Sequence, residues 1–170
     1  MLAQRLGLSI NSTRPLSDWS PTHDTSLEAW YQFGAGITLN GSDVSVWADS
    51  SPNGIDMTAS GTEQPAYSAG SLTFVSADKN NLQTTGQISL SGDFTIGLIF
   101  NPSISAPGTI LGDNAGGSSG HEFMKYTSTT NLRLKIDNTI GNLPLDAGTF
   151  GENYIVITRV SNVLTLWKDG

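Results

Sequence analysis

Hydrophobic and polar residues alternate with a period of two along much of the chain after Leu27. In Asp93–Asn101, large apolar residues occupy every second position, and in Asn131–Asp137 they alternate with charged residues. A period of two places successive side chains on opposite faces of a β-strand. Both segments are therefore predicted to be strands, and the second is expected to keep one face in water.

The end of the chain carries two further strand signals. Tyr154–Val160 is rich in β-branched residues and nearly apolar throughout, which is typical of a central strand. Val163–Lys168 follows directly after Ser161 and Asn162, a two-residue hairpin signal. Shorter segments also predicted to be strands are Leu27–Phe33, Val44–Trp47, Leu72–Val75, Thr109–Leu111 and Glu122–Tyr126.

Clusters of Gly, Asn, Asp, Ser and Pro separate these segments, as at Asn40-Gly41 and Pro52-Asn53-Gly54. The chain has 19 glycines among 170 residues, only 14% charged residues, and no repeat of 20 to 50 residues. Roughly ten short strands without a long helix predict an all-β, antiparallel sandwich or barrel. The length suits one such domain.

The first 26 residues differ from the rest, because Pro15 and the pair Ser20-Pro21 interrupt any regular pattern. We therefore expect an irregular N-terminal arm over 1–26 and one domain over 27–170. The chain stops at Asp169-Gly170, a strong hairpin-turn dipeptide that comes directly after a strand. Unless Val163–Lys168 is simply the terminal strand, the domain is expected to continue in a longer protein.

Charge is distributed unevenly along the chain, whose net charge is −7. The first 17 residues hold two arginines and no acid, whereas the remainder holds six bases and fifteen acids. An acidic body argues against nucleic acid as a partner, because phosphates are bound by clustered Lys and Arg. The basic arm is either a solvated tail or an anchor on another protein. As an anchor, its contact residues are expected to be Leu2, Arg5, Leu8, Arg14 and Trp19.

Targeting signals are missing from the sequence. No apolar run approaches the ~20 residues of a membrane-spanning helix, and Arg5 interrupts the short apolar start, which is not a signal peptide. The chain has no cysteine, which excludes disulfides and thiolate metal sites.

The spacing of aromatic and turn residues is similar to that of concanavalin A-like lectin/glucanase (laminin-G-like) domains. The segments that carry this resemblance are Leu27–Tyr31, Val44–Gly54, Gln64–Tyr67, Leu72–Phe74, Ser91–Ile96 and Leu164–Gly170. The resemblance implies a two-sheet jelly-roll sandwich. Three large aromatic residues of these segments, Trp30, Trp47 and Phe74, are expected to be buried between the sheets.

Domains that this chain resembles recur in virion proteins of tailed phages, including those of marine hosts such as cyanobacteria. The resemblance therefore implies a non-enzymatic virion structural, decoration or adhesion protein, part of a homo- or hetero-oligomeric assembly. Its arm would contact other virion proteins, and its lectin-like jelly roll would face a host-surface glycan. The alternatives are a soluble carbohydrate-binding lectin domain and a glucanase-like hydrolase, because this fold hosts many functions.

Calcium is the metal that the oxygen-rich loops would suit. Asp49, Asn53 and Asp56 lie in a segment that resembles the first half of a calcium loop, but Ser60 occupies the position where a bidentate Glu is required. Asp113 and Asn114 are further oxygen donors that a calcium site at the sheet rim would recruit. The alternative is that these residues form ordinary Asx turns.

Catalytic patterns are not found. Glucanases of this fold carry paired carboxylates on one strand, and glycoside hydrolysis needs such a pair, yet the acids here are spread singly. The chain has two histidines and no Gly-x-Ser-x-Gly motif. Carbohydrate recognition needs an exposed aromatic ring surrounded by polar side chains. The residues expected to provide it are Tyr31, Asp113, Asn114, His121 and Tyr126.

Overall fold

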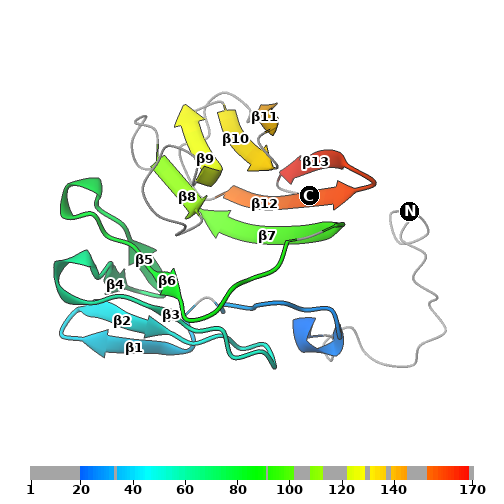
Figure 1. The fold of residues 1–170 in the computed structure, drawn as a ribbon. Helices are drawn as coiled ribbons and strands as arrows, with labels where there is room; N and C mark the ends of the chain where they lie inside the picture. The colour runs from blue at the N-terminus through cyan, green and yellow to red at the C-terminus, as the bar shows by residue number, and fades with distance from the viewer. Residues whose placement is uncertain are drawn as a thin grey trace. The chain divides into compact units, whose positions relative to one another are not determined.

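The computed structural model describes residues 20–32, 34–90, 92–101, 108–112, 122–128, 131–136, 139–144 and 153–168. These residues form antiparallel sheets connected by turns, short 3-10 helices and loops (Figure 1). The prediction of an all-β, antiparallel protein is confirmed. Contacts divide the chain into two compact units, Met1–Ser89 and Leu90–Gly170. This division falls inside the segment 27–170 that the sequence predicted as one domain.

Met1–Ser89, here called the N-terminal unit, contains one sheet with the strand order β5-β4-β2-β3-β6, and β1 pairs with β2 beside this path. Its strands have two to five residues. They are β1 (Ile37–Asn40), β2 (Asp43–Trp47), β3 (Met57–Thr58), β4 (Ala66–Ser68), β5 (Ser71–Thr73) and β6 (Gln83–Thr84). Its 3-10 turns are η2 (Pro21–His23), η3 (Gly61–Glu63) and η4 (Ser76–Asp78).

The described interior of the N-terminal unit is small and half polar. Its buried side chains are Val44, Ser51, Gln64 and Pro65. Gln64 lies inside because its amide is satisfied: its Oε1 accepts a hydrogen bond from Asn40 at 3.1 Å and its Nε2 donates to the Ala59 carbonyl at 3.3 Å. A buried amide is tolerated when both of its ends are hydrogen-bonded.

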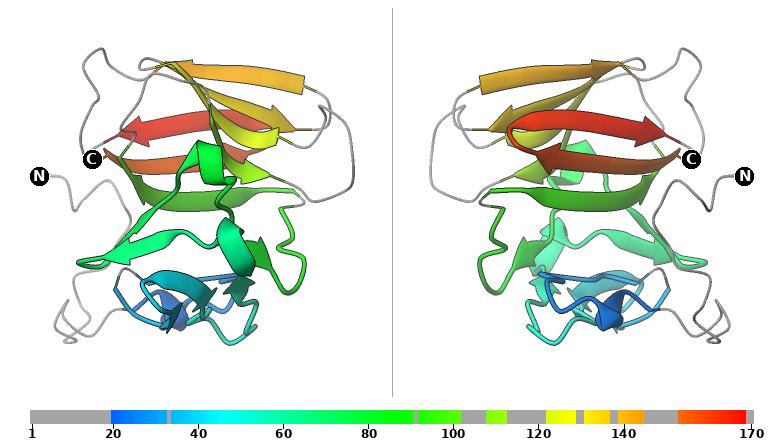
Figure 2. Two further views of the ribbon diagram at one scale, coloured as in Figure 1. Left: turned by 90° about the vertical axis from the view of Figure 1, so that its left-hand side faces the viewer. Right: turned by 90° about the vertical axis from the view of Figure 1, so that its right-hand side faces the viewer.

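Leu90–Gly170, here called the C-terminal unit, contains two sheets with longer strands. One sheet has the order β11-β10-β9-β8 and the other β13-β12-β7. Figure 2 shows β7, β12 and β13 side by side in one layer, with β9 and β10 in the other. The strands are β7 (Phe94–Phe100), β8 (Gly108–Gly112), β9 (Glu122–Ser128), β10 (Asn131–Ile136), β11 (Thr139–Pro144), β12 (Asn153–Val160) and β13 (Val163–Lys168).

An apolar core lies between the two sheets of the C-terminal unit. The four-stranded sheet contributes Met124, Tyr126, Leu132 and Leu134, and the three-stranded sheet contributes Ile155 and Ile157. Ile96, Leu98, Phe100 and several other half-buried residues pack against this cluster. This arrangement of two apolar sheet faces is a β-sandwich.

The four strongest strand predictions are confirmed, since β7, β10, β12 and β13 fall within a residue of the predicted bounds. The turn between the last two is also confirmed: Ser161 and Asn162 have φ values of 49° and 67°, which fit a type I′ hairpin. Asp93 Oδ1 accepts a hydrogen bond from the Ser161 amide at 2.8 Å and so ties the turn to the start of β7.

The predicted strand Leu27–Phe33 is wrong for the part that the structure describes, because 27–32 belong to no sheet. Trp30 there bonds to a loop instead: its amide donates to Asp49 Oδ1 and its carbonyl accepts from the Ser50 amide, each at 2.8 Å. Strands that the sequence did not indicate are β1, β3, β4, β6 and β11. Of these, β3, β4 and β6 have only two or three residues and are too short to show a period of two.

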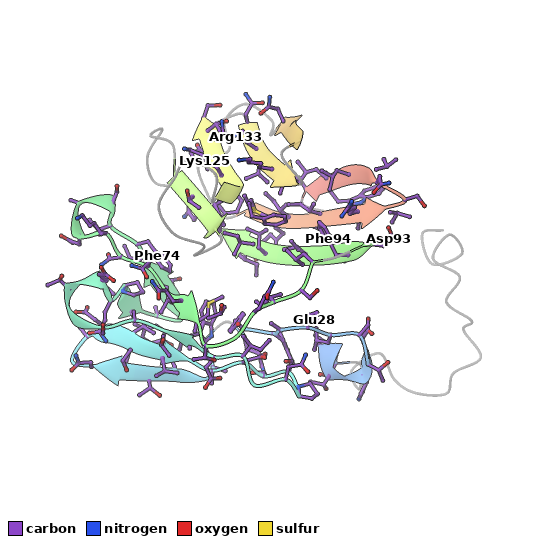
Figure 3. The ribbon with its side chains drawn as sticks, in the orientation of Figure 1. Glu28, Phe74, Asp93, Phe94, Lys125 and Arg133 are labelled. Carbon is purple, nitrogen blue, oxygen red and sulfur yellow. The ribbon has the colours of Figure 1, made fainter. Side chains whose placement is uncertain are left out.

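The three aromatic residues expected between two sheets have different environments. Phe74 is 52% exposed on the N-terminal unit (Figure 3), so its prediction is wrong. Trp30 and Trp47 are half-buried. Trp47 packs its ring on Tyr31 at 5.6 Å, and its Nε1 donates to the carbonyls of Gln32 and Ala35 at 3.1 Å. These residues are therefore fixed to loops rather than to a second sheet.

The arm residues 1–19 lie outside the described residues, and with them all five anchor candidates, Leu2, Arg5, Leu8, Arg14 and Trp19. Among the residues that are described, no helix is both long and apolar enough to span a membrane.

Candidate functional site

The carboxylate of Asp49 is the centre of a hydrogen-bonded loop network in the N-terminal unit. Its Oδ1 accepts from the amides of Trp30 and Ser51, each at 2.8 Å. Its Oδ2 accepts from the Ser51 hydroxyl at 2.6 Å and the Ile55 amide at 2.9 Å. Both oxygens therefore accept hydrogen bonds from this chain: three donors belong to Ser51 and Ile55 in the same loop, and the fourth is the distant Trp30 amide.

The other two predicted calcium ligands have partners in the same network. Asp56 Oδ1 accepts from the Asp49 amide at 2.9 Å, and Asn53 Nδ2 donates to the carbonyls of Leu27 and Glu28 at 3.1 and 2.9 Å. Asn53 thus turns its donor group toward the loop 27–28. The Asx turn of this loop is that of Asp49, whose Oδ1 accepts the amide of Ser51 two residues on.

Burial raises the pKa of Asp49, but hydrogen bonds from Ser51, Trp30 and Ile55 outweigh burial and hold that pKa below its ordinary value. Hydrogen bonds to the charged form stabilise it. Within the described ranges, no three His, Cys, Asp or Glu side chains gather in a way that would hold a metal ion. The arrangement supports the Asx-turn interpretation for Asp49, whereas Asn53 and Asp56 make other hydrogen bonds within the same network. It gives the calcium hypothesis no further support.

Tyr31, a predicted carbohydrate contact, is half-buried against the same network. Its hydroxyl donates a hydrogen bond to the Ile55 carbonyl. Burial, together with the charges of Asp49 and Asp56, raises the pKa of Tyr31 to about 12. Its hydroxyl is hydrogen-bonded and its ring packs against Trp47 within the chain, so only part of the Tyr31 ring is exposed for contact with a glycan.

Tyr126 was predicted to be an exposed carbohydrate platform, and the structure corrects this expectation. Tyr126 is 5% exposed and belongs to the core of the C-terminal unit, where its ring meets Phe100 edge-on at 6.4 Å. The alternation that places Met124 inward on β9 places Tyr126 inward as well. The remaining carbohydrate candidates, Asp113, Asn114 and His121, lie outside the described residues.

A polar pocket of about 230 Å³ lies on the N-terminal unit, at residues that the sequence did not indicate. Its lining is Thr58, Ala59, Ser60, Glu63, Asn81 and Gln83. Asn81 Nδ2 donates to Glu63 Oε2 at 3.2 Å, and the Asn81 amide donates to the Glu63 carbonyl at 2.9 Å. Thr58 lies on β3, Glu63 on η3 and Gln83 on β6, and the other lining residues lie in the adjoining loops, so only the folded sheet brings them together.

Hydroxyl, amide and carboxylate groups in one shallow pocket suit a small ligand that both donates and accepts hydrogen bonds. The pocket contains one carboxylate, that of Glu63. It therefore does not supply the pair of carboxylates that glycoside hydrolysis uses.

The C-terminal unit exposes two chemically different faces. On the four-stranded sheet, Lys125 lies opposite Arg133 across β9 and β10, and Lys135 follows two positions later (Figure 3). These residues alternate with the buried positions, so they share the outward face. The outward positions of the three-stranded sheet carry no charge. They are Thr95, Gly97, Ile99, Tyr154, Val156, Thr158, Val160, Val163, Thr165 and Trp167.

No protein-family model matches this sequence, and neither a curated protein nor a solved structure is significantly similar to it.

Proposed function

We propose that this chain is a non-enzymatic virion structural, decoration or adhesion protein, anchored through its N-terminal arm and displaying a concanavalin A-like jelly roll. The observation that carries this proposal is the sandwich of the C-terminal unit, closed around Met124, Leu132, Leu134, Ile155 and Ile157. Two antiparallel sheets facing across such a core are the architecture from which jelly rolls are built. The resemblance of the sequence to phage-associated domains supplies the biological setting.

A structural role is supported by how the polar groups of the N-terminal unit are used. The Asp49 carboxylate, the Asn53 amide and the Gln64 amide all hold backbone segments or other side chains of the chain itself. A catalytic carboxylate would instead face a substrate cleft beside a second acid or base.

The anchor is tested by removing residues 1–20. The shortened chain is expected to keep its β-rich circular dichroism spectrum but to be absent from purified particles that contain the full chain. A matched variant, Arg5→Glu with Arg14→Glu, reverses the charge of the arm at constant length and is expected to reduce incorporation. Incorporation of the shortened chain at the level of the full chain would contradict the anchor.

A second candidate function, a soluble carbohydrate-binding lectin domain, is favoured by the polar pocket at Glu63 and Asn81. A glycan array probed with the full chain, with and without calcium, tests it. Bound glycans should be lost in Glu63→Gln and Asn81→Ala and retained in Glu28→Gln, whose carboxylate lies outside the pocket. The lectin candidate is abandoned if the array shows no binding under either condition, or if the three variants bind alike.

A further inference from the structure

The outer face of the three-stranded sheet in the C-terminal unit is exposed and apolar. Six of its large hydrophobic side chains are 40% to 64% exposed: Ile99, Tyr154, Val156, Val160, Val163 and Trp167. Three threonines and one glycine complete the ten outward positions. Charged side chains normally protect the exposed faces of sheets, and the neighbouring four-stranded sheet has them.

The register of the strands arranges these side chains in rows across the sheet. One row contains Gly97 on β7, Val156 on β12 and Trp167 on β13, because Val156 pairs with both of the others. The size of the side chain thus increases from one edge of the sheet to the other. At the small end, an added Cβ at Gly97 would meet no other atom within 4 Å.

The area of this face is of the size that associating proteins bury. From the exposed fractions, the six hydrophobic side chains present on the order of 500 Å² of surface, which is in the upper range of apolar patches on monomers. With its threonines and rim, the face approaches the roughly 800 Å² that each partner contributes to a standard protein interface.

We propose that this face binds the same face of a second copy of the chain, with Trp167 of each copy seated over Gly97 of the other. Consider a twofold axis that runs parallel to β12 between two such faces. It places β7 of one copy opposite β13 of the other, and each row of one copy opposite the same row of the other. It places the largest side chain of the row over the smallest and Val156 against Val156. Isologous interfaces require self-complementarity of this kind.

Charge on this face does not oppose a second copy as the occupant. The chain carries a net charge of −7, so two copies repel one another at most of their surfaces. The ten outward positions of this sheet contribute no charge to that repulsion. Sheets that pack face to face lie about 10 Å apart, and residues of the size of Val156 and Trp167 fill that distance.

The test is the oligomeric state of the full chain, measured by sedimentation equilibrium over a range of concentrations. We expect reversible dimers for the unchanged chain. Trp167→Ala removes the large side chain and is expected to weaken association by about 30-fold or more, the effect of a central aromatic residue at an interface. Gly97→Leu fills the hollow, where an added Cβ would meet no atom of its own copy within 4 Å, and is expected to weaken association similarly.

The exchange variant, Gly97→Trp with Trp167→Gly, restores one large and one small residue in the row and is expected to recover dimers. Thr109→Leu, at an exposed position of β8 outside this face, is the control for adding a Leu and should leave association unchanged. Circular dichroism of each variant separates loss of association from loss of fold.

The inference is overturned if the unchanged chain is monomeric at all concentrations, or if folded Trp167→Ala and Gly97→Leu associate as the unchanged chain does. If the unchanged chain forms dimers but the folded exchange variant does not, the pairing of Trp167 with Gly97 is overturned. The inference goes beyond the proposed function, since incorporation into a particle is measured separately and neither outcome decides the other.

Discussion

The two units of this chain are stabilised in different ways. In the described N-terminal unit, two of the four buried side chains are polar. A single carboxylate, that of Asp49, accepts four hydrogen bonds that stabilise its own loop and join it to the segment of Trp30. In the C-terminal unit, two sheets enclose a continuous apolar core. The first unit therefore depends on hydrogen-bond geometry and the second on the removal of hydrocarbon from water.

Strand length explains the difference. The strands of the N-terminal unit have two to five residues, whereas those of the C-terminal unit have five to eight. Because only every second residue of a strand faces the core, a three-residue strand contributes one or two inward side chains. Short strands thus leave too little apolar surface to bury. Side-chain hydrogen bonds to the connecting loops stabilise this unit instead.

The largest effect is expected in the core of the C-terminal unit. Ile157, which is fully buried at the centre of β12, is flanked across the ladder by Ile96 and Leu166. Ile157→Ala leaves a cavity that the neighbouring sheet cannot close, and should lower the free energy of unfolding by about 2–5 kcal/mol. Urea denaturation followed by circular dichroism measures it.

The matched control is Thr109→Ala, which truncates an exposed β-branched residue in the same unit. Its effect is expected to stay within about 0.5 kcal/mol. Equal effects of the two substitutions would show that the apolar core does not govern the stability of this unit.

The next effect concerns Asp49. Asp49→Asn keeps the shape of the side chain but replaces one accepting oxygen with an NH2 group. This group then faces the N–H or O–H donors from which the oxygen accepted hydrogen bonds. Hydrogen bonds to charged groups contribute about 1.5–3 kcal/mol each, so a loss of about 2–3 kcal/mol is expected in the N-terminal unit. Fluorescence of Trp30 and Trp47 in a Trp19→Phe, Trp167→Phe background reports its unfolding.

Asp56→Asn provides the comparison, because Asp56 accepts the Asp49 amide through Oδ1 alone and an amide oxygen can take the same role. We expect a change below about 1 kcal/mol. If Asp56→Asn destabilised the unit as much as Asp49→Asn, the network would depend on negative charge in general rather than on the four bonds of Asp49.

Acid provides a weaker perturbation of the same network. The pKa of Asp49 is lower in the folded chain than in the unfolded chain. In the pH range where this carboxyl titrates, the folded state therefore binds fewer protons than the unfolded state. The stabilisation is complete above the unfolded pKa of about 3.9 and is lost as the pH falls through the folded value. The urea concentration at the denaturation midpoint of the N-terminal unit should decrease as the pH falls below about 4, and this decrease should be smaller in Asp49→Asn.

The sequence was most informative where the strands are long. In Asp93–Asn101 and Asn131–Asp137 the alternation extends over enough positions to set the strand and its inward face, and β7 and β10 follow it. For Tyr154–Val160, the nearly continuous run of apolar residues was interpreted as typical of a central strand. The same apolar residues also form the exposed face that contains Tyr154, Val156 and Val160. Hydrophobicity alone does not distinguish this exposed face from the buried face of the strand.

The polar features were less predictable. The Asp49 turn was recognised, but its bond to Trp30 spans 19 residues, and nothing in the local pattern identifies the distant donor. The pocket at Glu63 and Asn81 depends on the pairing of β3 with β6, two strands of two residues each. The misplacement of Tyr126 has a different cause: a tyrosine in an alternating strand satisfies the pattern on either face, because its ring is apolar and its hydroxyl is polar.

The smallest effect is expected at Tyr126, whose hydroxyl is a polar exception within the apolar core. It is buried and has no hydrogen-bond partner among the described residues, and burial raises its pKa. An unsatisfied buried hydroxyl carries a desolvation cost, so Tyr126→Phe should leave the C-terminal unit unchanged or stabilise it by up to about 1 kcal/mol. Tyr31→Phe, which removes a hydroxyl bonded to the Ile55 carbonyl, should instead destabilise the N-terminal unit by about 1 kcal/mol. Urea denaturation of both variants decides the matter: a loss of stability in Tyr126→Phe would mean that the apolar unit, like the polar one, depends on a hydrogen bond at its centre.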